Sequence, residues 1–341
     1  MKGNEIISNI LNNNFNTEIP FTLINSLYGG KFINDSIENY YKIPELYLEG
    51  QTKLYDKLQT DVIFAPFALS LFTTPFNGEI KYFSNQTPTI CKHAIDSSCD
   101  FSTLKVPNPL NYKEIKYILK SLKLLKESFK NEAPICATIP SPIDLPLILM
   151  GFDKWLEIFL FDPHKRDIIL EITSQFFNII IDELFSNGAD ILAIGVPFSS
   201  SYFMTKEIIE KHTAPIYKKY LNQIKYPFIL HHGGQPIINS LDFLKGIDSA
   251  LGFYLDSRDS ISKARLKLGP DRLLLGNIDG VSLYKIKEET LNIKIDMLLK
   301  NCGEDQKFIF GTSQGDIPLS TDINKLIRMR NRIKGYKRSN D

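Results

Sequence analysis

The 341-residue sequence predicts an α/β fold, a (β/α)8 barrel of the TIM type with an N-terminal helical extension. Two observations favour this fold. Short apolar runs alternate along the chain with longer amphipathic segments, and most of each run is apolar, which is typical of strands covered on both faces. No G-x-G-x-x-G follows an early run, which disfavours the alternative, an open doubly wound sheet with a dinucleotide site.

Three helices are predicted from the spacing of apolar residues. The first spans 112–131, where lysines fill the face opposite the apolar one. The second spans 163–187 and ends in Asn187-Gly188, a pair typical of helix C-caps. The third spans 205–221.

The apolar runs predict seven strands. They lie at 61–65, 135–139, 191–196, 228–231, 251–255, 273–275 and 307–310. Strands that alternate with helices pair in parallel through right-handed crossovers, and about eight such units close a barrel. Residues 1–60 fit the alternation less regularly, so we assign them to the extension and residues 61–341 to the barrel, within a single domain over 1–341.

Composition limits the function. The chain has 40 Lys+Arg and 39 Asp+Glu, a net charge of +1, which argues against a nucleic-acid partner and against a polybasic membrane contact. The N-terminus lacks the apolar segment of a signal peptide, and the four cysteines are too few for a disulfide scaffold. We expect a cytoplasmic enzyme with a small-molecule substrate; a homodimer is compatible with the sequence.

Polar residues and glycines gather where the predicted strands end. In a barrel the carboxyl ends of the strands form the active site, and a ligand cavity needs polar groups and close backbone approach. The candidate catalytic residues are His231, Asp256, Asn277 and Asp279. The candidate substrate- or cofactor-binding residues are Pro142, Asp144, Ser199, Ser200, His232, Gln235, Gln314 and Asp316.

Among these candidates, the adjacent histidines His231 and His232 point most specifically to catalysis or metal binding. Either imidazole could serve as a general base or a metal ligand. Because adjacent strand residues point to opposite faces, we expect at most one ring to face the cavity. The four candidate aspartates come from four loops, and their spacing does not show which of them converge.

Seven segments follow one another in an order that is familiar from a known family. They are LKVPNPL (104–110), PSPIDLPLILMG (140–151), FDP (161–163), GADILAIGVPFSSS (188–201), LHHGG (230–234), LGNID (275–279) and GTSQGDIP (311–318). Together they resemble the uroporphyrinogen decarboxylase superfamily, which includes the corrinoid-dependent thiol methyltransferases. The resemblance runs from about residue 56 to residue 330 and also implies a (β/α)8 barrel.

The thiol methyltransferases of this family bind zinc through one histidine and two cysteines. Zinc lowers the pKa of a thiol, so that the thiolate attacks a methyl group on cobalt. The histidine position corresponds to His231, whereas Gly233 and Gly315 stand at the cysteine positions and offer no side-chain ligand. The zinc site of the thiol methyltransferases is therefore not expected here, unless His232, Asp256 or Asp316 supplies the missing ligands.

The decarboxylase branch binds a polycarboxylate tetrapyrrole with an arginine-rich N-terminal motif. This chain has no counterpart of that motif before residue 61, and the family's aspartate and tyrosine fall at Pro66 and near Ile148. None of the candidate residues at the strand ends is an Arg or a Lys.

The resemblance implies three functions. The first is a methyltransferase that moves a methyl group from a corrinoid, either methylcobalamin or a corrinoid protein, to a small acceptor. His231 would then orient or deprotonate the acceptor, while Asn277 and Asp279 line the pocket. The alternatives are a lyase that acts on a tetrapyrrole, as the decarboxylases do, and a non-catalytic ligand-binding barrel.

Overall fold

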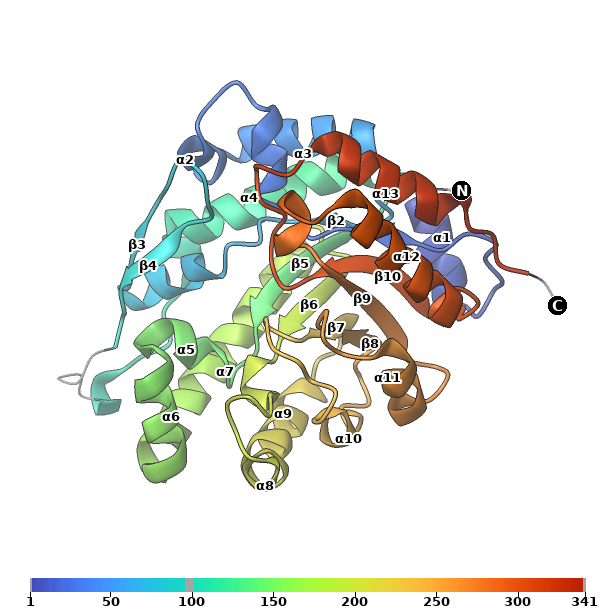
Figure 1. Ribbon diagram of the computed structural model, residues 1–341. Coiled ribbons are helices and arrows are strands. Elements are labelled where there is room, and N and C mark those ends of the chain that lie inside the picture. Colours follow the sequence, from blue (N-terminus) through green and yellow to red (C-terminus); the bar gives the residue numbers. More distant parts are fainter. Residues whose placement is uncertain (1, 96–100, 340–341) are drawn as a thin grey trace.

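The computed structural model describes residues 2–95 and 101–339, and it confirms the predicted barrel (Figure 1). Eight strands pair in parallel in the order β1-β10-β9-β8-β7-β6-β5-β2. The two end strands meet where the Asp61 N–H donates to the Phe21 carbonyl at 2.8 Å. The strands are β1 (Phe21–Thr22), β2 (Ile63–Phe64), β5 (Ile135–Pro140), β6 (Ile191–Gly195), β7 (Phe228–His231), β8 (Gly252–Tyr254), β9 (Leu273–Asp279) and β10 (Phe308–Ser313).

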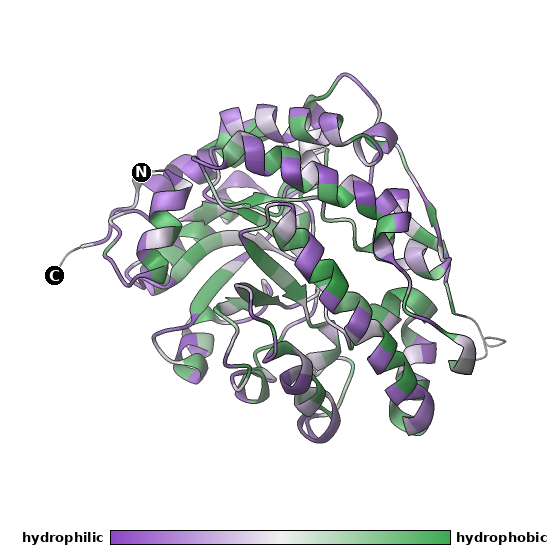
Figure 2. Ribbon diagram, turned by 180° about the vertical axis from the view of Figure 1, so that it is seen from behind, coloured by the Kyte–Doolittle hydropathy of each residue, from purple (hydrophilic) through white to green (hydrophobic). Residues whose placement is uncertain are grey.

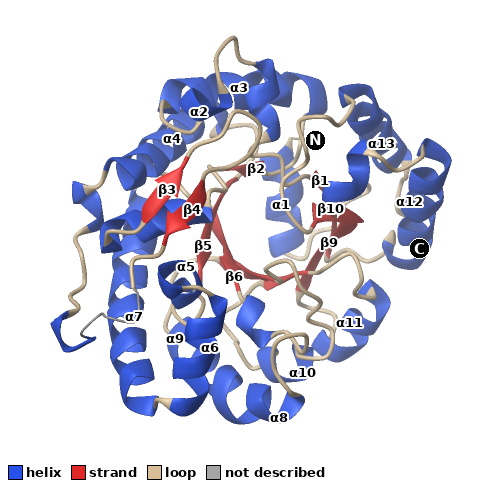
Figure 3. Ribbon diagram, turned by 60° about the vertical axis from the view of Figure 1, so that its left-hand side comes forward, coloured by secondary structure: helices blue, strands red, loops and turns tan. Residues whose placement is uncertain are grey.

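Helices surround the ring of strands, as the view in Figure 3 shows. The three predicted helices correspond to α4, to α7, and to α8 and α9, which are joined by a π-helical turn over Ile209–Thr213. The helices are α1 (Gly3–Leu11), α2 (Ile37–Tyr40), α3 (Pro44–Leu58), α4 (Lys113–Phe129), α5 (Leu145–Met150), α6 (Phe152–Phe161), α7 (Pro163–Ser186), α8 (Lys206–Ile208), α9 (Ala214–Leu221), α10 (Leu241–Leu244), α11 (Ile261–Leu268), α12 (Glu288–Cys302) and α13 (Ile323–Gly335).

The barrel begins earlier than predicted. Strand β1 lies inside residues 1–60, where Phe21 and Thr22 pair with Phe310 and Gly311, so the boundary at residue 61 is wrong. A strand of two residues is too short to show a hydrophobic period, and for that reason the sequence did not reveal it. The remainder of the segment is largely helical, as predicted.

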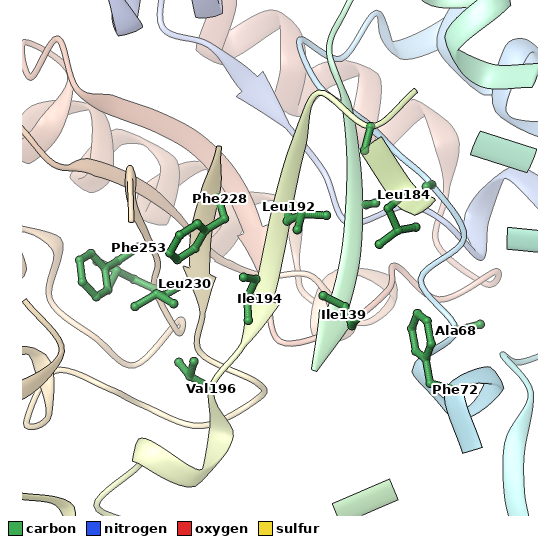
Figure 4. Close-up of a cluster of buried hydrophobic side chains, with 14 of the residues drawn as sticks. Ala68, Phe72, Ile139, Leu184, Leu192, Ile194, Val196, Phe228, Leu230 and Phe253 are labelled. Carbon is green, nitrogen blue, oxygen red and sulfur yellow. The ribbon is translucent and has the colours of Figure 1, made fainter. Parts of the chain in front are cut away.

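The core has two parts because successive strand residues point to opposite faces. The outward faces of the strands pack against the helices; Figure 4 shows Leu192 and Ile194 of β6 beside Ile139 of β5 and Leu184 of α7. The strands consequently carry the most hydrophobic colouring in Figure 2, whereas the helices carry hydrophilic residues on their outer sides. The inward faces form a separate apolar cluster.

Helix α1 closes the end of the barrel opposite to the strand carboxyl ends. Its Ile6 and Ile10 are buried in the same cluster as Val62, Ile229 and Leu275 from the barrel interior. Burying a side chain of this size contributes about 1.5–3 kcal/mol. The open end of the barrel is therefore the other one, where the strand carboxyl ends meet.

Tyr40, Tyr41 and Tyr47 form an aromatic cluster in the N-terminal extension. The rings of Tyr40 and Tyr41 lie 5.3 Å apart between centroids, and those of Tyr40 and Tyr47 lie 4.9 Å apart. All three side chains are buried, and Tyr47 Oη donates to the Phe64 carbonyl at 2.9 Å, which attaches the extension to β2.

An antiparallel hairpin of β3 (Glu79–Lys81) and β4 (Thr89–Lys92) is inserted between β2 and α4. Within residues 2–95 and 101–339, no helix combines the length and the hydrophobicity needed to cross a bilayer. Cys91 is exposed, Cys136 and Cys302 are buried, all three are free thiols, and Cys99 lies outside the described residues.

Candidate functional site

A cavity of about 530 Å³, here called the central cavity, opens at the carboxyl ends of the strands. Its lining residues follow β1, β2, β5, β6, β7 and β10, and the turn of the β3–β4 hairpin adds three more. They are Leu27, Phe67, Ala68, Leu69, Ser70, Gln86, Thr87, Pro88, Thr138, Ile139, Pro140, Asp144, Leu147, Ile148, Ala193, Gly195, Pro197, His231, Gly233, Gln314, Gly315 and Asp316.

His231, the last residue of β7, lies buried in the wall of this cavity. Its Nδ1 accepts the Gly233 N–H at 3.0 Å, so the neutral ring carries its proton on Nε2. Burial, reinforced by the neighbouring His232, holds the pKa of His231 well below its usual value. Nε2 has no hydrogen-bond partner among the described residues. His231 therefore presents an unused neutral donor.

His232 lies beside His231 but does not line the central cavity. The expectation that at most one ring faces the cavity is confirmed, although the two rings are stacked with centroids 4.4 Å apart. Strand β7 ends at His231, so the alternation of side chains does not extend to the next residue. Burial, with a smaller effect of Arg258, lowers the pKa of His232 to about 3, which keeps this imidazole neutral.

Asp256 is the centre of a buried network behind the histidines. Arg258 donates to its two carboxylate oxygens from Nε at 2.7 Å and from Nη2 at 3.0 Å, and Gln314 Nε2 donates at 2.6 Å. His232 Nδ1 lies 3.3 Å from Asp256 Oδ2. Arg258 stands three residues after the end of the predicted strand 251–255, and it was not among the residues predicted from the sequence. Its charge pairs with Asp256, and it does not line the central cavity.

Asn277 and Asp279 do not line the central cavity, which corrects the prediction made from the sequence. They border a separate pocket of about 240 Å³ near α11 and α12. The Asn277 side-chain amide donates to the carbonyls of Asp256 and Asp259, each at 2.7 Å, so it holds the loop after β8. Asp279 Oδ1 accepts the Ser282 N–H at 3.2 Å.

Asp144 lines the central cavity with a carboxylate whose oxygens are already hydrogen-bonded. It accepts the hydroxyl of Ser141, the Tyr217 hydroxyl at 2.7 Å and the Phe198 N–H at 2.9 Å. It thereby ties the loops after β5 and β6 to α9. Burial raises the pKa of Asp144 to about 7 despite these donors.

Asp316 plays a similar part on the opposite side of the mouth. Its Oδ1 accepts the Leu27 N–H at 2.9 Å, which joins the loop after β10 to the loop after β1. Burial raises the pKa of Asp316 to about 7. Asp144 and Asp316 are the two ionisable carboxyls among the described residues that line the central cavity.

Four other predicted binding residues lie outside the lining of the central cavity: Pro142, Ser199, Ser200 and Gln235. The Ser199 hydroxyl donates to the Val196 carbonyl at 2.7 Å, and the Ser200 hydroxyl donates to the Pro236 carbonyl at 2.8 Å. The Pro142 carbonyl accepts the Thr173 hydroxyl at 2.8 Å. Through these hydrogen bonds, Pro142, Ser199 and Ser200 stabilise the loops and do not face the cavity.

Several lining residues were missed by the sequence analysis. Thr138 is one of them: its hydroxyl has no hydrogen-bond partner among the described residues. A polar residue inside the apolar strand ICATIP is a signal that could have drawn attention to it. Phe67, whose ring packs edge-on against His231 at 6.0 Å, and the hairpin-turn residues Gln86 and Thr87 gave no such signal.

Comparison with known proteins decides the family. The uroporphyrinogen decarboxylase (URO-D) family matches residues 3–336. The chain belongs to this family. The methylcobamide:CoM methyltransferase MtbA of Methanosarcina acetivorans is 25% identical over 240 residues, which cover 66% of this chain and 68% of MtbA. The uroporphyrinogen decarboxylase of Geobacter sulfurreducens is 22% identical over 290 residues, covering 81% of each protein.

A solved structure of a methyltransferase from Methanosarcina mazei has the same fold. It covers 98% of both chains with a TM-score of 0.85, at 15% sequence identity. Members of the URO-D family that resemble this chain thus include both methyltransferases and decarboxylases. The choice between the two reactions depends on the site.

The residues of this URO-D member do not fit the family's zinc site. Gly233 has a φ of +65°, and a Cβ built on it would lie 2.6 Å from Pro197 Cδ, so a cysteine there needs a shift of the backbone or of Pro197. Gly315 has room, since its nearest such contact is Val281 Cγ2 at 3.7 Å. Within the described part of the chain, no group of three His, Cys, Asp or Glu residues is arranged to hold a metal ion.

Proposed function

We propose that this URO-D family member transfers a methyl group from a corrinoid to a small acceptor, by a route that does not use the zinc-bound thiolate. The observation that carries this proposal is that the central cavity offers no cationic partner for a carboxylate: among the described residues, no Lys or Arg belongs to its lining.

A decarboxylase of the family acts on a tetrapyrrole that carries many carboxylates. Burying carboxylates without cationic partners is costly. Arg258 is the cationic side chain near the site, and its guanidinium is already paired with Asp256. The cavity therefore supports the methyltransferase branch, where neither the methyl group nor the amide-bearing rim of a corrin requires a cationic pocket.

The size of the central cavity suits the acceptor but not the corrin ring. A volume of about 530 Å³ falls within the roughly 300–1,000 Å³ of small-molecule sites. A small acceptor fits inside, whereas a corrin ring is a large macrocycle and would be presented at the mouth, by methylcobalamin or by a corrinoid protein as partner. The hairpin residues Gln86 and Thr87 lie in the wall of this mouth.

A methyl-corrinoid would supply a methyl group without its bonding electron pair, which stays on cobalt, while the acceptor would provide the electron pair of the new bond and release its proton to solvent. The task of this chain is to hold the acceptor in line with that methyl group. His231 does so by donating from Nε2, since its Nδ1 is occupied by the Gly233 N–H. Of the two roles predicted for His231, this geometry supports orientation of the acceptor over removal of its proton.

The experiment is a methylcobalamin demethylation assay, followed by absorbance, with a panel of small acceptors. We expect acceptor-dependent loss of the methyl-corrinoid spectrum, and a loss of rate of about 100-fold or more in His231→Ala. The exposed Ser201→Ala variant is the matched control. Decarboxylation of a porphyrinogen, or an unchanged spectrum with every acceptor and with a corrinoid protein, would overturn the proposal.

A second candidate function is a non-catalytic ligand-binding barrel. The observation that favours it is that Asp144 and Asp316 already accept hydrogen bonds from protein donors. Saturable ligand binding without methyl transfer, under conditions where the corrinoid also binds, would support this candidate over the methyltransferase.

A further inference from the structure

Two buried polar side chains in the central cavity have unused hydrogen-bonding groups. His231 Nε2 and Thr138 Oγ1 have no partner among the described residues, although the side chains are only 5% and 6% exposed. Both residues line the central cavity. Buried polar atoms are nearly always hydrogen-bonded, so these two atoms indicate a position where a bound molecule completes the bonding.

The strand register places the two groups around a common space. Thr138 lies on β5 and His231 on β7, with β6 between them; Thr138 pairs with Ala193 and His231 pairs with Gly195. Ala193 and Gly195 also line the cavity and are the smallest residues available. Two strand spacings amount to about 10 Å, and the two-residue offset between Ala193 and Gly195 adds about 7 Å along the strands, so the two side chains lie diagonally across β6; the small β6 residues leave the space between them open for a molecule of a few heavy atoms.

The two groups have complementary hydrogen-bonding properties. His231 Nε2–H is a neutral donor, because Nδ1 accepts the Gly233 N–H. The Thr138 hydroxyl can donate or accept. Together they suit a ligand group that accepts a hydrogen bond from His231 and that donates to, or accepts from, the Thr138 hydroxyl. An alcohol, a thiol or an amide can do both.

The residues that line the central cavity disfavour a charged ligand. An anion in this cavity would find the carboxyls of Asp144 and Asp316 but no Lys or Arg among the described lining residues, and burial of an anion without a cationic partner is costly in a low-dielectric space. A cation would find the two carboxyls already accepting hydrogen bonds from Phe198, Tyr217 and Leu27. An uncharged molecule avoids both costs.

We infer that the central cavity binds a small uncharged molecule through a hydroxyl, thiol or amide group held by His231 and Thr138, and that it discriminates against anions such as sulfonates. This inference rests on the proposed function in one respect: the bound molecule would be the methyl acceptor. It separates this chain from its relative MtbA, which is named as a methyltransferase that acts on CoM. Thr138 is the specificity-determining residue in this scheme.

The test measures binding to the full chain by ligand-observed NMR, with three thiols that differ in charge. They are 2-mercaptoethanol, which is neutral, 2-aminoethanethiol, which is cationic, and 2-mercaptoethanesulfonate, which is anionic. We expect the neutral thiol to bind about tenfold or more tighter than the sulfonate. Thr138→Val should weaken the neutral thiol by about fivefold to tenfold, whereas Thr138→Ser should restore it.

Thr290→Val, which makes the same chemical change at an exposed position of α12, is the matched control. Thermal unfolding of each variant shows whether it is folded. Tighter binding of the sulfonate or of the amine, no binding of the neutral thiol (ordered water only), or an unchanged affinity in Thr138→Val would each overturn the inference. These results do not require methyl transfer, so a failure of the inference and a failure of the proposed function are separately visible.

Discussion

Pro197 fills the space that a side chain on residue 233 would need. Gly233 is left-handed, with φ +65°, and a Cβ on it would lie within 2.9 Å of three Pro197 ring carbons. In the thiol methyltransferases that the sequence resembles, a zinc-binding cysteine stands at this position. The packing of the loops after β6 and β7 therefore leaves no room for a metal-binding side chain at position 233 without a shift of Pro197 or of the backbone.

Gly233 and Gly315 are predicted to respond differently to substitution by cysteine. Gly233→Cys should lower the free energy of unfolding by about 1–3 kcal/mol, because it combines strain at a positive φ with a clash against Pro197. Gly315→Cys should change it by about 0.5 kcal/mol or less, since its Cβ meets only Val281 at 3.7 Å. Urea unfolding of both variants measures the difference, and equal destabilisation would contradict the packing argument.

Asp144 should make stability fall as the pH rises. Its pKa is about 7 in the folded protein against an ordinary value of 3.8, so between these values the folded state holds a proton that the unfolded chain has released. The folded state therefore binds more protons, and the free energy of unfolding decreases as the pH rises from about 4 to about 7. Asp316, whose pKa is also raised to about 7, contributes in the same direction.

The check compares unfolding free energies at about pH 5 and about pH 8 in wild type, Asp144→Asn and Asp316→Asn. Each asparagine removes one titrating carboxyl, so each variant should lose less stability than wild type over this interval. The exposed Asp153→Asn variant serves as control. A pH dependence in Asp144→Asn identical to that of wild type would show that this carboxyl is already ionised in the folded state.

The Asp256–Arg258 pair should matter for stability even though Arg258 is partly exposed. Asp256 is fully buried, and Arg258→Ala leaves its carboxylate without two charge-assisted donors, at a cost of about 2–3 kcal/mol. Arg258→Lys keeps the charge but loses the two-pronged geometry, so it should fall between wild type and alanine.

A double-mutant cycle with Asp256→Asn measures the coupling of this pair, which we expect to reach about 1–3 kcal/mol. Additive effects of the two single changes would mean that Gln314, which donates to Asp256 at 2.6 Å, is sufficient to satisfy the carboxylate.

Helix α1 should stabilise the barrel by covering its closed end. Ile6 is fully buried against the interior of the barrel, so Ile6→Ala should cost about 2–4 kcal/mol. Leu11→Ala, on the same helix but 45% exposed, should cost well under half as much. Thermal and urea unfolding distinguish the two, and equal losses would indicate that α1 contributes through helix formation rather than through burial.

The sequence predicted the fold better than it predicted the site. Long periodic segments such as α4 and α7, and the apolar barrel strands β2 and β5 to β10, could be recognised from the sequence because their faces are covered by the core. Strand β1 has two residues and carries none. Among the candidate site residues, His231, Asp144, Gln314 and Asp316 do line the central cavity, whereas Asn277 and Asp279 border another pocket.

The reason for this difference is geometric. A residue's place at a strand end is local information, but the side of the loop that it faces depends on neighbours far along the chain. Asp256 lies 58 residues from Gln314 and Asp144 lies 73 residues from Tyr217, yet hydrogen bonds join each pair and decide which way the carboxylates point.

By itself, the sequence determined the barrel, the strand ends that form its mouth and the glycines at positions 233 and 315, since periodicity and residue identity are properties of the chain. Only the tertiary structure decided that Pro197 closes position 233, that the carboxyls of Asp144 and Asp316 are raised in pKa, and that His231 and Thr138 retain unused hydrogen-bonding groups. Desolvation and hydrogen-bond saturation are properties of a packed interior, and they arise only when distant segments meet.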